Sequence, residues 1–145
     1  MSKGSDVNRT KVLTLILAAI LLLAIAGTIL IVLFPQPSEP FTELYLLGPG
    51  GKASGYPTNL TVGQTGNVTV SVVNHENANV DYRLVATLAN KTVTTKTFSL
   101  ANGPWEDSIS FTPTTRGAEQ KMQVDLYKGG NTTVYRSVYL VLTVN

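Results

Sequence analysis

A run of 23 uncharged, almost wholly apolar residues from Val12 to Phe34 constrains this chain more than any other feature. At about 1.5 Å per residue, a helix of that length spans roughly 34 Å, which is enough to cross a hydrocarbon core of about 30 Å. A helix is required there because lipid offers no partners to backbone amides and carbonyls. We therefore predict one transmembrane helix over residues 12–34, in contact with membrane lipid.

The short segment before this helix, residues 1–11, is basic. Lys3, Arg9 and Lys11 outweigh Asp6, whereas the other flank has no basic residue close to the membrane. Short flanks rich in Lys and Arg stay in the cytoplasm. We therefore predict a cytoplasmic N-terminal tail, a single-pass signal-anchor helix in the cell membrane, and an extracellular C-terminal region.

A cleaved signal peptide is the alternative for the same stretch. Ala24-Ile25-Ala26 has the small-x-small form of a cleavage site, and residues 12–23 have the length of a signal-peptide core. The apolar run continues through residues 28–34, however, so cleavage would leave a hydrophobic stub. This favours an uncleaved anchor.

The residues after the helix are predicted to form a stalk and one domain. Three prolines within residues 35–40 favour an extended, semi-rigid linker. Residues 35–145 carry eight basic and eight acidic side chains, so the high isoelectric point belongs to the tail, and no basic surface is expected to bind nucleic acid. The chain has no cysteine, which excludes disulfides, thiolate metal sites and a cysteine nucleophile.

An alternation of apolar and polar residues, with a period of two, runs through residues 41–145 and indicates short β-strands. Glycine-, proline- and asparagine-containing turns separate them. This predicts a mainly β domain, an immunoglobulin-like β-sandwich of seven or eight strands, in which Trp105 packs in the core or caps it. The expected strands cover residues 42–47, 58–62, 67–74, 82–88, 92–100, 108–112, 121–127 and 134–144.

The residue patterns predict no catalytic residue, cofactor or metal site. His75 is the only histidine, and one histidine cannot build a zinc site. Glu106 and Asp107 are neighbours, so in a strand they face opposite sides. Residues 48–52, GPGGK, lack the spacing of a phosphate loop and read as a turn. A weaker hypothesis is a calcium site built from oxygens of Asn74, Glu76, Asn79 and Asp81.

Asparagine sequons are the most specific signal for modification. Four lie after the predicted helix, and each ends in threonine and falls at an expected strand edge or turn. A fifth begins at Asn8, on the predicted cytoplasmic side. We predict N-glycosylation, in a host that has the machinery, at Asn59, Asn67, Asn90 and Asn131.

Residues 41–76, which include LLGPGGKASGYPTNL and VGQTGNVTVSVVNHE, resemble an archaeal membrane family, the "domain of unknown function 1616" group. The resemblance is expected to run from Phe41 to Val144. It implies an archaeal cell envelope, where exported domains are commonly N-glycosylated. Members often carry several transmembrane helices before this domain, whereas this chain has one predicted helix.

Two functions follow as hypotheses. The first is a membrane-anchored, non-enzymatic envelope protein whose domain mediates binding or structural contact with a protein or an envelope glycan. The alternative is an accessory subunit of a membrane complex in envelope glycan assembly or export. A binding module should work as a released domain, whereas a subunit should co-purify with a larger membrane assembly.

Overall fold

The computed structural model describes residues 3–35 and 39–145. The chain divides into two compact units, one within residues 1–38 and one within residues 39–145. The predicted stalk, residues 35–40, includes residues 36–38, which lie outside the described part.

The first unit is one α-helix, α1, from Lys3 to Leu33. Its span from Asp6 to Leu33 is long and apolar enough to cross a membrane by length and composition. The helix begins nine residues before the predicted start at Val12, and in this polar extension the Thr10 hydroxyl donates to the Asp6 carbonyl at 2.8 Å.

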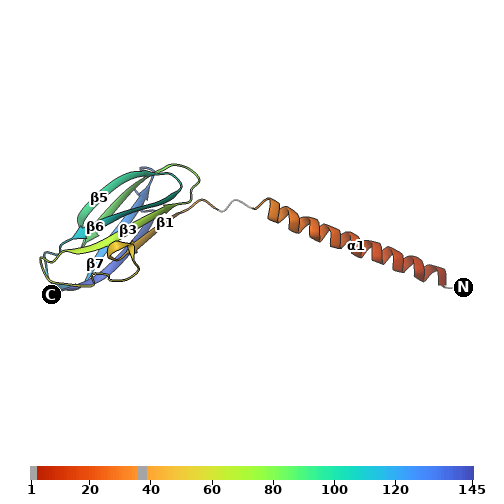
Figure 1. Ribbon diagram of the computed structural model, residues 1–145, viewed down its shortest axis with the longest axis horizontal. Coiled ribbons are helices and arrows are strands. Elements are labelled where there is room, and N and C mark those ends of the chain that lie inside the picture. The colour runs from red at the N-terminus through yellow and green to blue at the C-terminus, as the bar shows by residue number, and fades with distance from the viewer. Residues whose placement is uncertain (1–2, 36–38) are drawn as a thin grey trace. The chain divides into compact units, whose positions relative to one another are not determined.

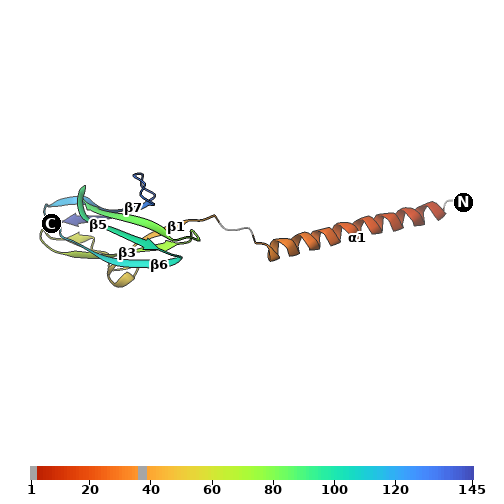
Figure 2. The ribbon, with the colours of Figure 1, turned by 90° about the horizontal axis from the view of Figure 1, so that it is seen from above.

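The second unit is a sandwich of two sheets, which Figure 2 shows as two layers, with β3 and β6 in one and β5 and β7 in the other. The three-stranded sheet has the order β1-β3-β6 and the five-stranded sheet the order β2-β8-β7-β4-β5. The strands, most of them labelled in Figure 1, are β1 Thr42–Leu47, β2 Asn59–Leu60, β3 Gly66–Asn74, β4 Val80–Leu88, β5 Lys91–Leu100, β6 Gly103–Phe111, β7 Gly117–Lys128 and β8 Arg136–Val144.

These eight strands confirm the predicted mainly β, immunoglobulin-like sandwich. Neighbours pair antiparallel except β2, which runs parallel to the end of β8. The largest difference in bounds is β6, expected at residues 108–112 but already begun at Gly103. Pro104 suggested a turn, yet β6 is an edge strand, where a proline is tolerated.

The core lies between the sheets and follows the predicted alternation. Val68, Val70 and Val72 of β3 are fully buried. Trp105 is partly buried against the core, as expected. Other fully or nearly buried side chains are Leu84, Ala86, Ile109, Phe111, Met122, Val124, Leu126 and Leu142.

The glycine-rich segment after β1 folds back over the outer face of the three-stranded sheet. Pro49–Gly51 forms a short 3₁₀ turn, and the Gly51 amide donates to the Thr69 hydroxyl at 3.2 Å. The Tyr56 hydroxyl donates to the Leu46 carbonyl at 3.0 Å. Residues 48–52 therefore form a turn that packs on the sheet.

The strand connections gather at two opposite ends of the sandwich. The linker end is the end at which β1 begins, and it carries the β3–β4, β5–β6 and β7–β8 connections. The cleft end carries the β2–β3, β4–β5 and β6–β7 connections.

Candidate functional site: a hydroxyl-lined cleft

The edge strands β5 and β6 belong to opposite sheets and follow one another in the chain. In the part of the chain that the structure describes, β5 pairs only with β4, and β6 only with β3. The sandwich therefore has an open seam between them, which side chains must close.

Two side-chain pairs close the seam toward the linker end. The Phe98 and Trp105 rings stack with centroids 3.8 Å apart and an interplanar angle of 7°. Next to them, the Lys96 ammonium forms an ion pair with the Asp107 carboxylate. The hydrogen bond from Lys96 lowers the pKa of Asp107 below its ordinary value, although partial burial opposes the shift.

A β-bulge in β5 changes the seam beyond these pairs. Ala86 pairs with Thr94 and Thr87 with Thr92, so Val93 is an extra residue on the β5 side. Bulges re-aim side chains and are frequent at sheet edges. Here Val93 packs against the core instead of pairing, and it lines a cleft at the cleft end of the seam.

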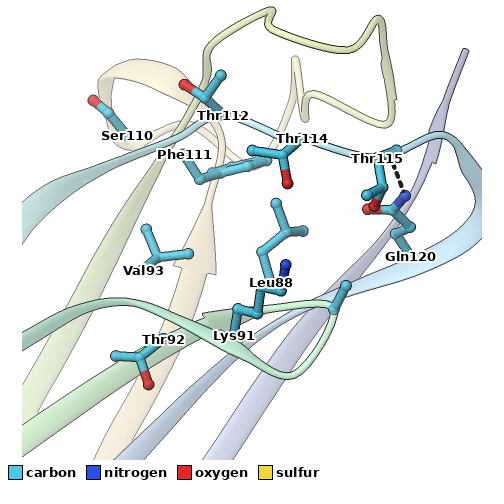
Figure 3. Close-up of a pocket in the computed structure, with 11 residues that line it drawn as sticks. Leu88, Lys91, Thr92, Val93, Ser110, Phe111, Thr112, Thr114, Thr115 and Gln120 are labelled. Atoms are coloured by element: carbon cyan, nitrogen blue, oxygen red, sulfur yellow. Dashed lines mark hydrogen bonds between the residues drawn. The ribbon is translucent and has the colours of Figure 1, made fainter.

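This cleft has a volume of about 360 Å³ and lies between the start of β5 and the end of β6 with the loop that follows (Figure 3). Its apolar lining comes from Leu88, Val93 and Phe111. Its polar lining consists mainly of hydroxyl groups, together with one ammonium and one carboxamide: Lys91, Thr92, Ser110, Thr112, Thr114, Thr115 and Gln120.

Part of this polar lining is held in place by hydrogen bonds. The Gln120 amide donates to the Thr115 carbonyl at 2.7 Å (Figure 3), and the Ser110 hydroxyl donates to Asn67 Oδ1 at 2.6 Å. Within the described part of the chain, the Lys91 ammonium and the Thr92 and Thr114 side chains make no such contact. These three exposed groups are available to a ligand.

The cleft offers hydroxyl and carboxamide groups and one ammonium over an apolar base, and its volume lies in the range of small-molecule sites. Its lining residues include no carboxylate, histidine or cysteine. Such a lining suits hydrogen bonding to a hydroxylated molecule and provides no side chain that acts as a general base near neutral pH.

A second polar cluster lies at the linker end and is centred on Glu76. Its carboxylate is only 6% exposed and accepts hydrogen bonds from Lys128 at 2.6 Å, Thr42 at 2.8 Å and Tyr135 at 3.2 Å. The Thr42 hydroxyl also contacts the Tyr82 hydroxyl at 2.6 Å. This cluster joins the start of β1 to the β3–β4 connection and to the end of β7.

The charges in this cluster shift each other's titration. Burial alone would raise the pKa of Glu76, but the hydrogen bonds from Lys128, Thr42 and Tyr135 and the charge of Lys128 outweigh it, so the pKa is lowered. The hydrogen bond to Glu76 raises the pKa of Lys128. Because the carboxylate is saturated by protein donors, we interpret the cluster as structural.

The structure does not bring the proposed calcium ligands together as a site. The Asn74 amide donates to the Ala78 and Leu100 carbonyls, Glu76 is paired with Lys128, and Asp81 accepts from Ser99. In residues 3–35 and 39–145, no three or more His, Cys, Asp or Glu side chains group as metal ligands.

His75 lies in the exposed β3–β4 connection, as expected. Its ring stacks on Phe41 with centroids 4.7 Å apart, and its Nε2 lies 3.6 Å from Glu43 Oε2. Glu106 and Asp107 face opposite sides of β6: Glu106 is exposed, and Asp107 points into the seam.

All four sequon asparagines of the domain are exposed. Asn90 and Asn131 lie in the β4–β5 turn and the β7–β8 connection. Asn59 Oδ1 accepts a hydrogen bond from Asn145, and Asn67 Oδ1 accepts one from Ser110. The structure thus places the sequons at separate points and leaves glycosylation as a prediction.

The sequence did not reveal the cleft. Its polar groups come from separate segments, residues 91–92, 110–115 and 120, and the bulge at Val93 has no sequence signature. The run Thr112-Pro113-Thr114-Thr115 is the only visible hint, and threonine-rich turns are common in β proteins.

Together, the two sheets and their strand order define an immunoglobulin-like β-sandwich preceded by one N-terminal apolar helix. The profile described as "Domain of unknown function (DUF1616)" matches residues 35–143, and the chain belongs to this family. The expected resemblance is thereby confirmed. A search of curated proteins gave no match.

Solved structures share the fold. The crystal structure of the CARDB domain of the PF1109 protein from Pyrococcus furiosus, in complex with di-metal ions, has 16% identity and a TM-score of 0.54, over 73% of this chain and 94% of that one. The solution structure of the same domain has 16% identity and a TM-score of 0.51, over 74% and 96%. A β-glucosidase from Listeria innocua, in complex with isofagomine, has 13% identity and a TM-score of 0.52, over 72% of this chain but 16% of the enzyme.

Proposed function

We propose that this chain is a non-enzymatic envelope protein, anchored in the cell membrane by residues 12–34, whose extracellular domain binds an envelope glycan in the cleft. The cleft carries the proposal. Hydroxyl groups from β5, β6 and the β6–β7 loop and the Gln120 amide of β7 surround it, and a saccharide presents matching hydroxyls.

The proposed topology has separate support. The apolar helix follows a segment that carries Lys3, Arg9 and Lys11, and basic flanks favour the cytoplasm. The chain enters the domain at the linker end, so the cleft lies at the opposite end of the sandwich.

Binding is tested with the full-length protein in mild detergent, by calorimetric titration with neutral oligosaccharides from the envelope of the host. The double variant Thr92→Val/Thr114→Val removes two available hydroxyls and keeps the side-chain shape. Loss of two hydrogen bonds at about 0.5–1.5 kcal/mol each predicts a drop in affinity of roughly 5- to 150-fold. Thr95→Val, exposed on β5 outside the cleft, is the matched control and should bind like the parent protein.

The alternative, an accessory subunit of a glycan-assembly or export complex, predicts a different result. The protein would then bind no free oligosaccharide and would co-purify in mild detergent with a larger membrane assembly. That pair of outcomes would overturn the binding-module proposal.

A further inference from the structure

Among the described residues, most of strand β8 pairs with another strand on one side only, although β1 of the opposite sheet lies close to it. β7 pairs with β8 from Arg136 to Val144, with one register shift near the end. On the other side, β2 reaches only Thr143 and Val144. The stretch from Arg136 to Leu142 is therefore a sheet edge.

The backbone groups that face this edge follow from the alternation of an extended strand. The amides of Thr143 and Asn145 point toward β2, because they donate to the Thr58 and Leu60 carbonyls at 2.8 and 2.9 Å. In an antiparallel sheet, every second residue directs its N–H and C=O to the same side. Ser137, Tyr139 and Val141 thus direct outward N–H and C=O groups that pair with no other strand in residues 3–35 and 39–145.

The other long edge strands carry features that oppose pairing with another chain. β5 has the bulge at Val93 and an inward-pointing charge at Lys96. β6 has Pro104 and an inward-pointing charge at Asp107. Bulges, prolines and inward charges are the usual means by which proteins block edges.

The edge of β8 has none of these features. Residues 137–142, SVYLVL, contain no charge and no proline, and their pairing with β7 is regular. Tyr139 is 61% exposed and Val141 45% exposed on the outer face. Val138 and Leu140, which face the core, are only partly buried. The strand therefore exposes apolar surface on both faces beside its unpaired amides.

We propose that this edge pairs with the same edge of a second copy of the chain, antiparallel and centred on Tyr139. A two-fold axis there places Tyr139 opposite Tyr139 of the second copy, and Ser137 opposite Val141. Because all three residues present their N–H and C=O to the edge, this register forms about six hydrogen bonds between the chains. Self-pairing of one patch is the isologous contact of a symmetric dimer.

The charges beside the edge favour the same register. On the outer face, Asp125 lies beside Ser137, and Lys121 lies beside Val141. Antiparallel pairing of Ser137 with Val141 puts the Asp125 carboxylate of one chain in the same row as the Lys121 ammonium of the other. A parallel register would put like charges in the same rows.

The pairing is tested by cross-linking the full-length protein in detergent, since the chain has no cysteine of its own. In the proposed register, the two Tyr139→Cys positions have Cα atoms about 5.5 Å apart, within the range of a disulfide. Mild oxidation should convert most of this variant to a covalent dimer. Thr95→Cys, equally exposed on the blocked edge strand β5, is the matched control and should stay monomeric.

A second substitution separates strand pairing from contact through the helix. Val141→Pro removes an amide that the monomer's own sheet does not use, so it should abolish the Tyr139→Cys cross-link and leave the circular dichroism spectrum unchanged. Val141→Lys serves the same purpose if the proline variant does not fold. Equal cross-linking at Thr95→Cys, no cross-linking at Tyr139→Cys, or cross-linking that survives both Val141 variants would overturn the proposal.

Discussion

Lys128 Nζ donates a hydrogen bond to Glu76 Oε2 at 2.6 Å and so joins two residues that lie 52 positions apart in the sequence. The Glu76 side chain is almost completely buried, whereas Lys128 is about one-third exposed. Glu76 also accepts a hydrogen bond from Thr42, the first residue of β1. The pair therefore holds the strand at which the chain enters the sandwich.

Replacing Lys128 with methionine should destabilise the domain by about 2–4 kcal/mol, because it leaves a buried carboxylate without its cation. This loss of stability is smaller than the loss expected for a fully buried ion pair, because solvent partly screens Lys128. Urea denaturation followed by circular dichroism measures it. Lys52→Met, at an exposed loop position, is the control and should change the free energy of unfolding by less than about 0.5 kcal/mol.

Stability should fall on the acid side as Glu76 and Asp107 take up protons. The pKa of each carboxyl is lowered in the folded chain, so below its ordinary value near 4 the unfolded chain binds more protons than the folded one. The free energy of unfolding should be constant above about pH 5 and decrease as the pH falls through the folded pKa values. Glu76→Gln and Asp107→Asn should each make the free energy of unfolding decrease less steeply at acid pH. The same decrease at acid pH in both variants as in the parent protein would show that these carboxyls do not stabilise the fold.

Lys128 contributes to the loss of stability at alkaline pH, because its pKa shifts upward whereas the pKa values of the two carboxyls shift downward. Its pKa is raised in the folded chain, so its contribution is complete below its ordinary value near 10.4 and is lost as the pH rises through the folded pKa. Thermal melts should therefore show a plateau between about pH 5 and pH 10. Lys128→Met should lower this plateau and make the alkaline decline shallower, whereas the raised pKa of Tyr82 keeps part of the decline.

The stacked pair Phe98–Trp105 should show an energetic coupling. In a double-mutant cycle, the Phe98→Ala/Trp105→Ala variant is expected to lose about 0.5–1.5 kcal/mol less stability than the sum of the two single variants, because each single change already removes the aromatic pair. A cycle of Trp105→Ala with Val85→Ala, which lies on the outer face of β4, is the control and should be additive. A coupling near zero for the stacked pair would mean that the seam is closed by burial alone.

The alternation of side chains was sufficient to predict most of the sandwich. Strand β1 was predicted with its observed bounds, Thr42–Leu47, because Leu44 and Leu46 alternate with outward residues as a strand requires. β2 was expected at residues 58–62 but pairs only over Asn59–Leu60. Short strands have little periodicity, and their extent depends on neighbours that the sequence does not reveal.

The candidate site was not predictable for a different reason. Lys91 and Thr114 lie on opposite sides of the cleft but 23 positions apart in the sequence, in segments whose composition resembles other polar turns. The bulge that places Val93 beside them depends on pairing between β4 and β5. The Glu76–Lys128 pair likewise arises only when the β3–β4 connection meets the end of β7.

The four sequons of the domain should differ in occupancy if the native host glycosylates them. Asn90 and Asn131 lie exposed in connections, and their side chains make no hydrogen bond to the described residues, so their amide nitrogens are accessible. Asn59 and Asn67 have side chains engaged with Asn145 and Ser110. Glycopeptide mass spectrometry of native protein should therefore find higher occupancy at Asn90 and Asn131 than at Asn59 and Asn67.

The same measurement tests the topology through Asn8. This sequon precedes the apolar run, and the basic residues around it favour the cytoplasm, where no glycan is expected. Asn8 serves as an internal control, because it is exposed like the other four and differs in its predicted side of the membrane. Glycan on Asn8 together with bare asparagines in the domain would reverse the proposed orientation. Bare asparagines at all five sequons would reject glycosylation and leave the orientation to external protease digestion of intact cells, which should remove the domain and spare the helix.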